Sequence, residues 1–182
     1  MNLYLVRHTR VDVPPGVCYG QADVPLAKTF ESELEPIRSR LSGIPFERVY
    51  CSPLTRCTQL ASSLGYPMQL DERLKELNFG RWEELPWDSV FDSETGEKWF
   101  ADYMNQACPD GESYQDLLQR VESFISDLPP TDGSLLVITH AGIIRAFRVL
   151  LKNWTVKRAF DKPVAYGQIT ILRKASLRHR KK

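Results

Sequence analysis

Two histidines and two arginines lie where strand-like segments give way to polar residues. The apolar segment 3–6 leads directly into Arg7 and His8, and His140 and Arg56 come just after similar segments further along the chain. Any one of these residues alone is more typical of a polar loop or a surface. Neighbouring cations repel one another unless an anion lies between them. Their joint placement therefore predicts a pocket for an anion.

A phosphoryl group suits such a pocket. The planar guanidinium of arginine binds phosphate oxygens in pairs, and a neutral imidazole can attack phosphorus to form a phosphohistidine. Free backbone N–H groups at Gly142, where a helix should begin, offer further donors to an anion. Cations and positioning lower most of the barrier to phosphoryl transfer, so we expect neither a metal ion nor another cofactor.

The leaving alkoxide needs a proton, and the segment "RLKELNFGRWEE" supplies carboxyl groups. Glu76 has apolar neighbours in Leu77 and Phe79, which we expect to desolvate its carboxyl and keep it protonated near neutral pH. Glu83 and Glu84 follow in the same segment and are predicted to be exposed surface residues.

Strand-like segments alternate with amphipathic helices along the chain. Strands are expected within 3–6, 46–53, 66–74, 134–139 and 164–172, and helices within 26–41, 54–64, 113–128 and 143–153. Strands that are apolar on both faces indicate an α/β sheet covered on both sides. Ligands of such sheets bind beyond the carboxyl ends of the strands, which is where the two histidines fall. Residues 75–112 are rich in aromatic side chains and should form short helices that cover part of the core. We expect side chains within 79–112 to distinguish one leaving group from another.

Length and composition fit one domain, which we place at 1–172. The net charge is +1, and the last ten residues hold six Lys and Arg and no acid, so residues 1–172 carry −5. We expect 173–182 to be a disordered basic tail that does not bind nucleic acid, because no aromatic residues interleave its charges. No apolar run approaches the ~20 residues of a membrane span, and no signal peptide is evident, so a cytoplasmic location is the default.

Five segments carry a resemblance to a known family: "LVRHT" at 5–9, "YCSPLTRCTQLA" at 50–61, "LKELNFGRWEE" at 74–84, "PDGESYQDLLQRV" at 109–121 and "VITHAG" at 137–142. In order and spacing they resemble the histidine phosphatase superfamily. The resemblance implies a phosphoglycerate mutase-like fold, a three-layer α/β/α sandwich with a mostly parallel sheet. It implies that His8 is the nucleophile and that Arg7, Arg56 and His140 hold the phosphoryl group. It also places Glu76 where the family has its proton donor.

Further details favour one branch. Thr9 stands where most members have glycine, and its hydroxyl either donates to phosphate or fills the turn. The segment "CYGQADVPL" is similar to the α-ribazole phosphatase branch, which removes a 5′-phosphate in cobalamin nucleotide-loop assembly. Tyr19 and Gln21 are then candidates for substrate contact, although a packed turn explains them equally well. Glu112 is a second candidate for acid–base chemistry or substrate contact, and the choice between Glu112 and Glu76 as principal proton donor stays open.

The favoured function is hydrolysis of a small phosphorylated metabolite through a phosphohistidine, with α-ribazole 5′-phosphate as the preferred substrate. The alternatives are a phosphoglycerate mutase and a broad-specificity sugar or nucleotide phosphatase. A non-catalytic phospho-ligand binding module is a weaker hypothesis, because every expected catalytic position is filled. We expect no membrane partner, and the sequence leaves the oligomeric state open.

Overall fold

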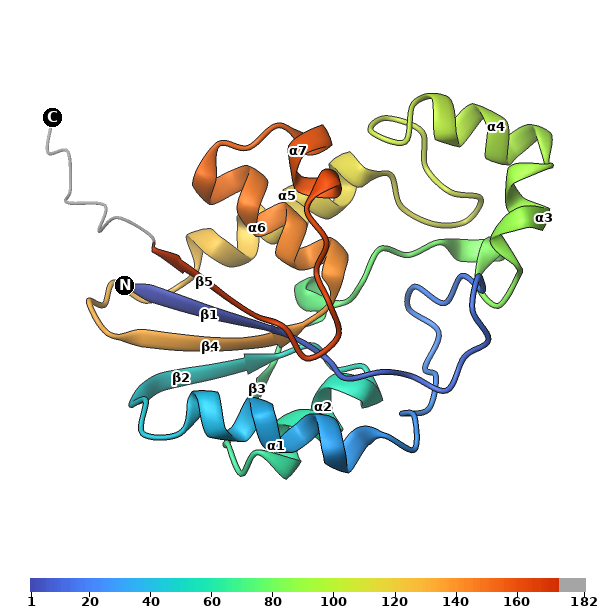
Figure 1. The fold of residues 1–182 in the computed structure, drawn as a ribbon. Helices are drawn as coiled ribbons and strands as arrows, with labels where there is room; N and C mark the ends of the chain where they lie inside the picture. The colour runs from blue at the N-terminus through green and yellow to red at the C-terminus, as the bar shows by residue number, and fades with distance from the viewer. Residues whose placement is uncertain (174–182) are drawn as a thin grey trace, which may run out of the picture.

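A central sheet with helices on both faces forms the fold (Figure 1). The structure is a computed structural model and describes residues 1–173. Its five strands are β1 (Asn2–Arg7), β2 (Phe46–Cys51), β3 (Gln69–Leu70), β4 (Ser134–Thr139) and β5 (Ile169–Arg173), in the order β3-β2-β4-β1-β5. The three-layer α/β/α sandwich that the sequence predicted is confirmed.

The sheet is mixed, which corrects the expectation of a mostly parallel sheet. β1, β2, β3 and β4 run parallel to their neighbours, but β5 pairs antiparallel with β1. The chain passes the carboxyl end of β1 before β5 begins, and there the amide of Gly167 donates to the carbonyl of His8. β5 therefore starts at that edge and has to run back across the sheet.

Alternation of side chains explains why the central residues of β1 and β4 are all apolar. In β1, Leu5 packs into the core on one face of the sheet and Val6 into the core on the other. In β4, Val137 and Ile138 divide in the same way. A central strand covered on both faces needs apolar residues at every position. This is what makes the two strands that carry the histidines recognisable from sequence.

Two pairs of long helices cover the sheet (Figure 1). α1 (Phe30–Leu41) and α2 (Thr55–Ser63) lie on one face, and α5 (Tyr114–Ser126) and α6 (Ala141–Lys152) lie on the other. Pro36 lies inside α1 and does not mark its start. Within the described residues, no helix combines the length and apolar character that a bilayer-spanning helix needs.

Short elements fill the segment between β3 and α5, as expected. They are η1 (Glu72–Leu74), η2 (Gly80–Trp82), α3 (Trp87–Phe91) and α4 (Glu94–Ala101). A further short helix, α7 (Val156–Asp161), follows α6 and was not predicted. Arg173, assigned to the tail from sequence, ends β5 and pairs with Asn2. The rest of the predicted tail, 174–182, lies outside the described residues.

Candidate active site

The two histidines meet at the carboxyl edge of the sheet, as their positions in the sequence predicted. β1 and β4 are parallel neighbours in which Arg7 is paired with Thr139, so the residue after each strand arrives at the same place. The ring centroids of His8 and His140 lie 5.1 Å apart. Both side chains are buried, with 1% and 0% of their surface exposed.

The tautomer of His8 is set by the backbone. Its Nδ1 lies 2.7 Å from the carbonyl oxygen of Thr9, and a carbonyl only accepts, so Nδ1 carries the proton. Burial, with Arg56 nearby, holds the pKa of His8 well below its ordinary value, so the ring is neutral. Nε2 then keeps its lone pair, which is the state an attacking imidazole needs.

Two side chains fix His140 at the start of α6. Its Nδ1 accepts from Nε of Arg56 at 3.3 Å, which leaves the proton on Nε2, 2.8 Å from the hydroxyl of Ser52. Burial lowers the pKa of His140 strongly, and the positive charge of Arg56 and the neighbouring His8 lower it further. The second imidazole is therefore neutral and rigidly placed.

Arg56 is fully buried in the first turn of α2 and holds the loop that follows β1. Its Nη1 donates to the carbonyl of Ala22 at 2.8 Å and its Nη2 to that of Gly20 at 2.5 Å. Asp23 ties the same loop to α2 by accepting from the amide of Thr55 at 2.9 Å. A guanidinium has five N–H groups, so Arg56 keeps donors for an anion beyond these bonds.

The side chain of Arg7 is held by residues of the segment that leads into β5. Its Nη1 donates to the carbonyl of Val164 at 2.6 Å, and its guanidinium carbon lies 3.8 Å from the ring centre of Tyr166. The hydroxyl groups of Tyr166 and Tyr19 lie 2.8 Å apart. The guanidinium carbon of Arg56 lies 5.3 Å from the ring of Tyr19, so the two tyrosines connect the two arginines.

The carboxyl group of Glu76 lies at the start of α6. It accepts from the amide of Gly142 at 3.1 Å and from that of Leu77 at 3.0 Å. A Cβ at Gly142 would lie 2.2 Å from Oε1 of Glu76, so only glycine leaves room for this approach. The Gly142 amide is thus taken by Glu76, whereas we expected it to be available to an anion. The hydroxyl of Thr9 is buried and has no hydrogen-bond partner among residues 1–173.

The carboxylate of Glu112 is bound by Arg120, which also binds the loop that carries Glu76. Its Oε1 accepts from Nε of Arg120 at 2.8 Å, and its Oε2 accepts from Nη2 at 3.0 Å. Arg120 also donates to the carbonyls of Arg73, Lys75 and Glu76 at 2.6, 2.7 and 2.9 Å. This arrangement favours a supporting role for Glu112 and gives Glu76 the position beside the histidines.

Glu83 corrects a prediction, because it is half-buried and not a surface residue. Its Oε1 accepts from the amides of Gln21 and Phe79 at 2.8 and 3.1 Å, and its Oε2 accepts from that of Ala22. The side chain of Gln21 donates to the carbonyl of Glu76 at 3.0 Å. Gln21 and Glu83 therefore join the loop after β1 to the loop of Glu76. Glu84 is exposed, as predicted.

Three residues of the site were missed from sequence, namely Ser52, Arg120 and Tyr166, and Glu83 was wrongly assigned to the surface. Ser52 had a signal, since it follows β2 at the same edge of the sheet as the histidines. Arg120 and Tyr166 had none, because most of their partners are far away in the chain and only the folded loops bring them together.

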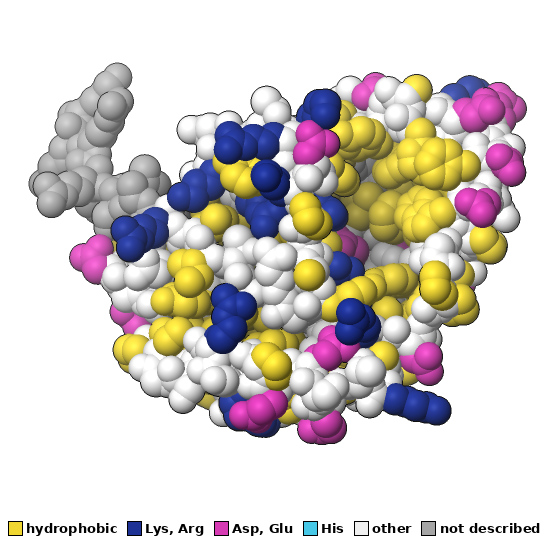
Figure 2. All heavy atoms as spheres, viewed as in Figure 1, with side chains coloured by type: hydrophobic (Ala, Val, Ile, Leu, Met, Phe, Trp, Pro, Cys, Tyr) yellow, Lys and Arg dark blue, Asp and Glu magenta, His cyan; other side chains and the backbone are white. Residues whose placement is uncertain are grey.

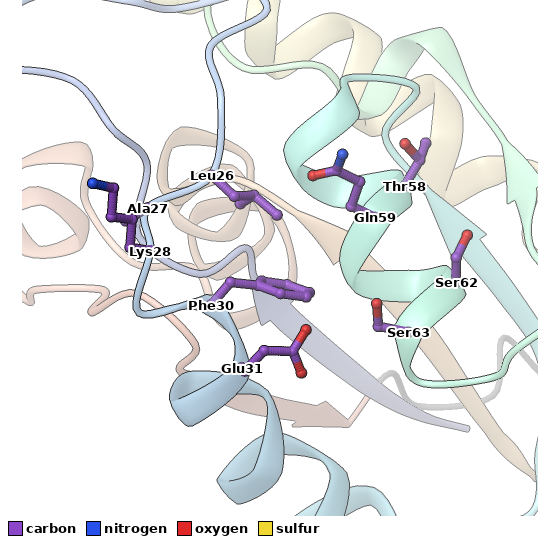
Figure 3. Close-up of a pocket in the computed structure, with 9 residues that line it drawn as sticks. All are labelled: Leu26, Ala27, Lys28, Phe30, Glu31, Thr58, Gln59, Ser62 and Ser63. Carbon is purple, nitrogen blue, oxygen red and sulfur yellow. The ribbon is translucent and has the colours of Figure 1, made fainter.

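A groove elsewhere on the surface is separate from this site. It has a volume of about 580 Å³ and lies between the start of α1 and α2, and Figure 3 shows Leu26 and Phe30 pointing across it toward α2, from which Gln59 points back. None of its lining residues is one of the candidate site residues. In residues 1–173, no group of three or more His, Cys, Asp and Glu side chains is placed to hold a metal ion.

Comparison with known proteins identifies the family. The pattern of the histidine phosphatase superfamily (branch 1) matches residues 3–180. The adenosylcobalamin/α-ribazole phosphatase of Salmonella typhimurium is 31% identical over 153 residues, which cover 79% of this chain and 76% of that protein. The "Probable phosphoglycerate mutase GpmB" of Enterobacter sp. is 32% identical over 154 residues, 79% of this chain and 70% of that protein.

Solved structures agree with this assignment. The α-ribazole phosphatase from Shigella flexneri has a TM-score of 0.84 to this chain at 25% identity, covering 94% of this chain and 89% of that one. This chain belongs to the histidine phosphatase superfamily, branch 1.

Proposed function

We propose that this enzyme hydrolyses phosphomonoesters through a phosphohistidine on His8, with α-ribazole 5′-phosphate as its preferred substrate. The observation that carries the chemistry is the state of His8: its Nδ1 proton is bound to a carbonyl and its ring is neutral, so Nε2 is ready to attack. The names of the relatives from Salmonella typhimurium and Shigella flexneri support the substrate.

In the first step, Nε2 of His8 attacks phosphorus and the bond from phosphorus to the leaving oxygen breaks. The charge on the phosphoryl oxygens is balanced by Arg7 and Arg56, and His140 is held against the same group by Arg56 and Ser52. Glu76 gives a proton to the leaving oxygen, which departs as an alcohol.

In the second step, a water molecule attacks the phosphohistidine. The carboxylate of Glu76, now without its proton, takes one proton from that water, and the nitrogen–phosphorus bond breaks. Inorganic phosphate leaves, and both His8 and Glu76 return to their starting states. The amides of Leu77 and Gly142 hold the carboxyl in place through both steps.

A phosphoglycerate mutase is the second candidate, because a relative of similar identity carries that name. A mutase returns the phosphoryl group to a bound acid and releases little inorganic phosphate. Release of inorganic phosphate from α-ribazole 5′-phosphate, ribose 5-phosphate and 3-phosphoglycerate separates the two. We expect full release, with the highest kcat/KM for α-ribazole 5′-phosphate, and none from a His8→Ala control. Conversion of 3-phosphoglycerate to its 2-isomer without phosphate release would contradict the proposal.

We also propose a cytoplasmic location. The four cysteines, Cys18, Cys51, Cys57 and Cys108, are buried and form no disulfide, which is typical of proteins in a reducing compartment. That 174–182 does not bind nucleic acid stays a prediction, as does the assignment of the folded part to one domain.

A further inference from the structure

A second cavity, of about 460 Å³, lies beside the histidine site and is walled by aromatic rings. The rings come from both sides: Phe79, Trp87, Trp99, Phe100 and Tyr103 from the segment around α3 and α4, and Phe160 from α7. Figure 2 shows hydrophobic side chains gathered around this hollow, with acidic and basic atoms at its inner edge. Cavities of this size and lining are typical of small-molecule sites.

The rings of this aromatic cavity hold one another in place. Phe79 packs edge-on against Trp87 at 5.1 Å between centroids, and Trp99 packs edge-on against Phe100 at 5.0 Å. Across the opening, the ring centroid of Tyr103 lies 5.5 Å from that of Phe160. Phe160 has 41% of its surface exposed. A flat aromatic ligand would find both faces and edges of rings to pack against.

Phe79 connects the cavity to the phosphate side of the site. A Cβ on Gly20 would lie 2.8 Å from the ring of Phe79, so the loop after β1 touches the cavity wall. The carbonyl of the same Gly20 accepts from Nη2 of Arg56. One residue therefore separates the guanidinium proposed to bind phosphate from the first ring of the cavity.

Arg145 connects the cavity to the proposed proton donor. Its guanidinium carbon lies 5.0 Å from the ring centre of Phe160, and Arg145 lies within electrostatic range of the carboxyl group of Glu76. It is one turn along α6 from Gly142, which binds Glu76. Nε of Arg145 is buried and has no hydrogen-bond partner among the described residues. A half-buried guanidinium between the reacting centre and an apolar cavity is placed to bind polar groups of a leaving group.

We propose that the aromatic cavity binds a ring carried by the leaving group of the substrate, and that Arg145 binds the hydroxylated linker between that ring and the phosphate. The inference rests on the proposed phosphatase function and deepens it. It assigns the substrate class as phosphomonoesters whose alcohol is a sugar bearing a flat aromatic ring. A small acid such as 3-phosphoglycerate would leave the cavity unused.

Two esters with the same linker test the cavity: α-ribazole 5′-phosphate carries a ring, and ribose 5-phosphate does not. For the unaltered protein we expect a clearly lower KM for the ring-bearing ester. Phe160→Ala should raise that KM about 5- to 10-fold, since it removes one ring contact, and leave the KM for ribose 5-phosphate within about twofold. Ile171→Ala, which removes a side chain that is 53% exposed on β5, is the matched control and should change neither.

Arg145→Met tests the linker. It should raise the KM for both sugar esters and leave that for ethyl phosphate, which has neither ring nor hydroxyl group, unchanged; Arg145→Lys should restore part of the loss. If Arg145 only supported the fold, Arg145→Met would raise the KM for all three esters and lower the melting temperature. Equal effects of Arg145→Met on the three esters would therefore overturn this assignment.

The failure of the cavity proposal can be told apart from that of the proposed function. If the unaltered protein has equal KM values for the two sugar esters, or if Phe160→Ala changes both equally, the cavity proposal is wrong while hydrolysis stands. If no ester releases phosphate, the proposed function is wrong. If α-ribazole 5′-phosphate is not hydrolysed but adenosine 5′-phosphate is, with the same dependence on Phe160, the cavity proposal is supported and the named substrate is wrong.

Discussion

At the scale of single residues, protonation decides what this site can do. His8 and His140 lie in a buried environment beside Arg56; Nδ1 of His8 is bound to a backbone carbonyl, and both nitrogens of His140 are bound to side chains. The sequence predicted that both rings would border the site, because each follows a buried strand. It did not predict their tautomers, since those depend on the Thr9 carbonyl for His8 and on Nε of Arg56 for His140.

The pH dependence follows from the lowered pKa of both rings. As the pH falls through about 6.5, the unfolded chain binds protons on these histidines and the folded protein does not. The free energy of unfolding should then fall by up to about 1.4 kcal/mol per histidine per pH unit. Above that pH the rings are neutral in both states, and the free energy of unfolding does not depend on their titration. Imidazole NMR should give both rings titration midpoints well below 6.5. A midpoint near 6.5 for His8 or His140, assigned with Gln variants, would contradict the proposed state.

The role of Glu76 is tested by the leaving group. Glu76→Gln keeps the size of the side chain but removes its proton transfer. We expect kcat/KM for an alkyl phosphate to fall about 10²- to 10⁴-fold. For p-nitrophenyl phosphate, whose leaving group needs little protonation, the loss should be much smaller. Equal losses for both esters would assign the proton to another group, and Glu112→Gln is the matched comparison.

At the scale of elements, the ends of strands and the starts of helices build the site. Strands β1, β2 and β4 could be placed from sequence because their apolar runs are continuous, and the residues that follow them converge as parallel strands require. The loop of Glu76 could not be placed in the same way. Its position depends on Arg120 and Glu83, which act across long distances in the chain and leave no local pattern.

A substitution in α6 tests whether catalysis needs the close approach of Glu76 to Gly142. In Gly142→Ala the new Cβ would lie 2.2 Å from the carboxyl oxygen of Glu76, so the carboxyl group must move. Alanine is a better helix former than glycine, so we expect no loss of helix stability in α6 itself. The kcat/KM for alkyl phosphates should fall at least about tenfold, with a smaller change for p-nitrophenyl phosphate. An unaltered rate with alkyl phosphates would show that the close approach of Glu76 is not needed.

Helix α5 supports the same loop through Arg120. Arg120→Met would remove the donors of three backbone carbonyls and the partner of Glu112. We expect the free energy of unfolding, measured in urea, to fall by roughly 2–4 kcal/mol. Adding Glu112→Gln should cost less than the sum of the two single changes, because no carboxylate would then be left without its guanidinium partner. If the losses in the free energy of unfolding were fully additive, the proposed coupling of Arg120 to Glu112 would be contradicted.

At the scale of the whole molecule, we propose that the edge of the sheet binds the phosphate and that the segment between β3 and α5 determines selectivity. The α/β/α architecture was predictable because alternation of strands and helices is visible in the sequence. The antiparallel direction of β5, helix α7 and the closing of the aromatic cavity by Phe160 were not, because each depends on how the last third of the chain returns to the edge of the sheet. We propose that residues 1–173 form a single domain, since β5 completes the sheet beside β1.

Trapping the phosphorylated enzyme tests the central claim most directly. The protein is mixed with a ³²P-labelled phosphomonoester, quenched in base within one turnover, and the labelled peptide is sequenced by mass spectrometry. The convergence of Arg7, Arg56 and His140 on His8 predicts one acid-labile, base-stable phosphoryl group, located on His8. A label on any other residue, or hydrolysis that continues in His8→Ala at an undiminished rate, would contradict it.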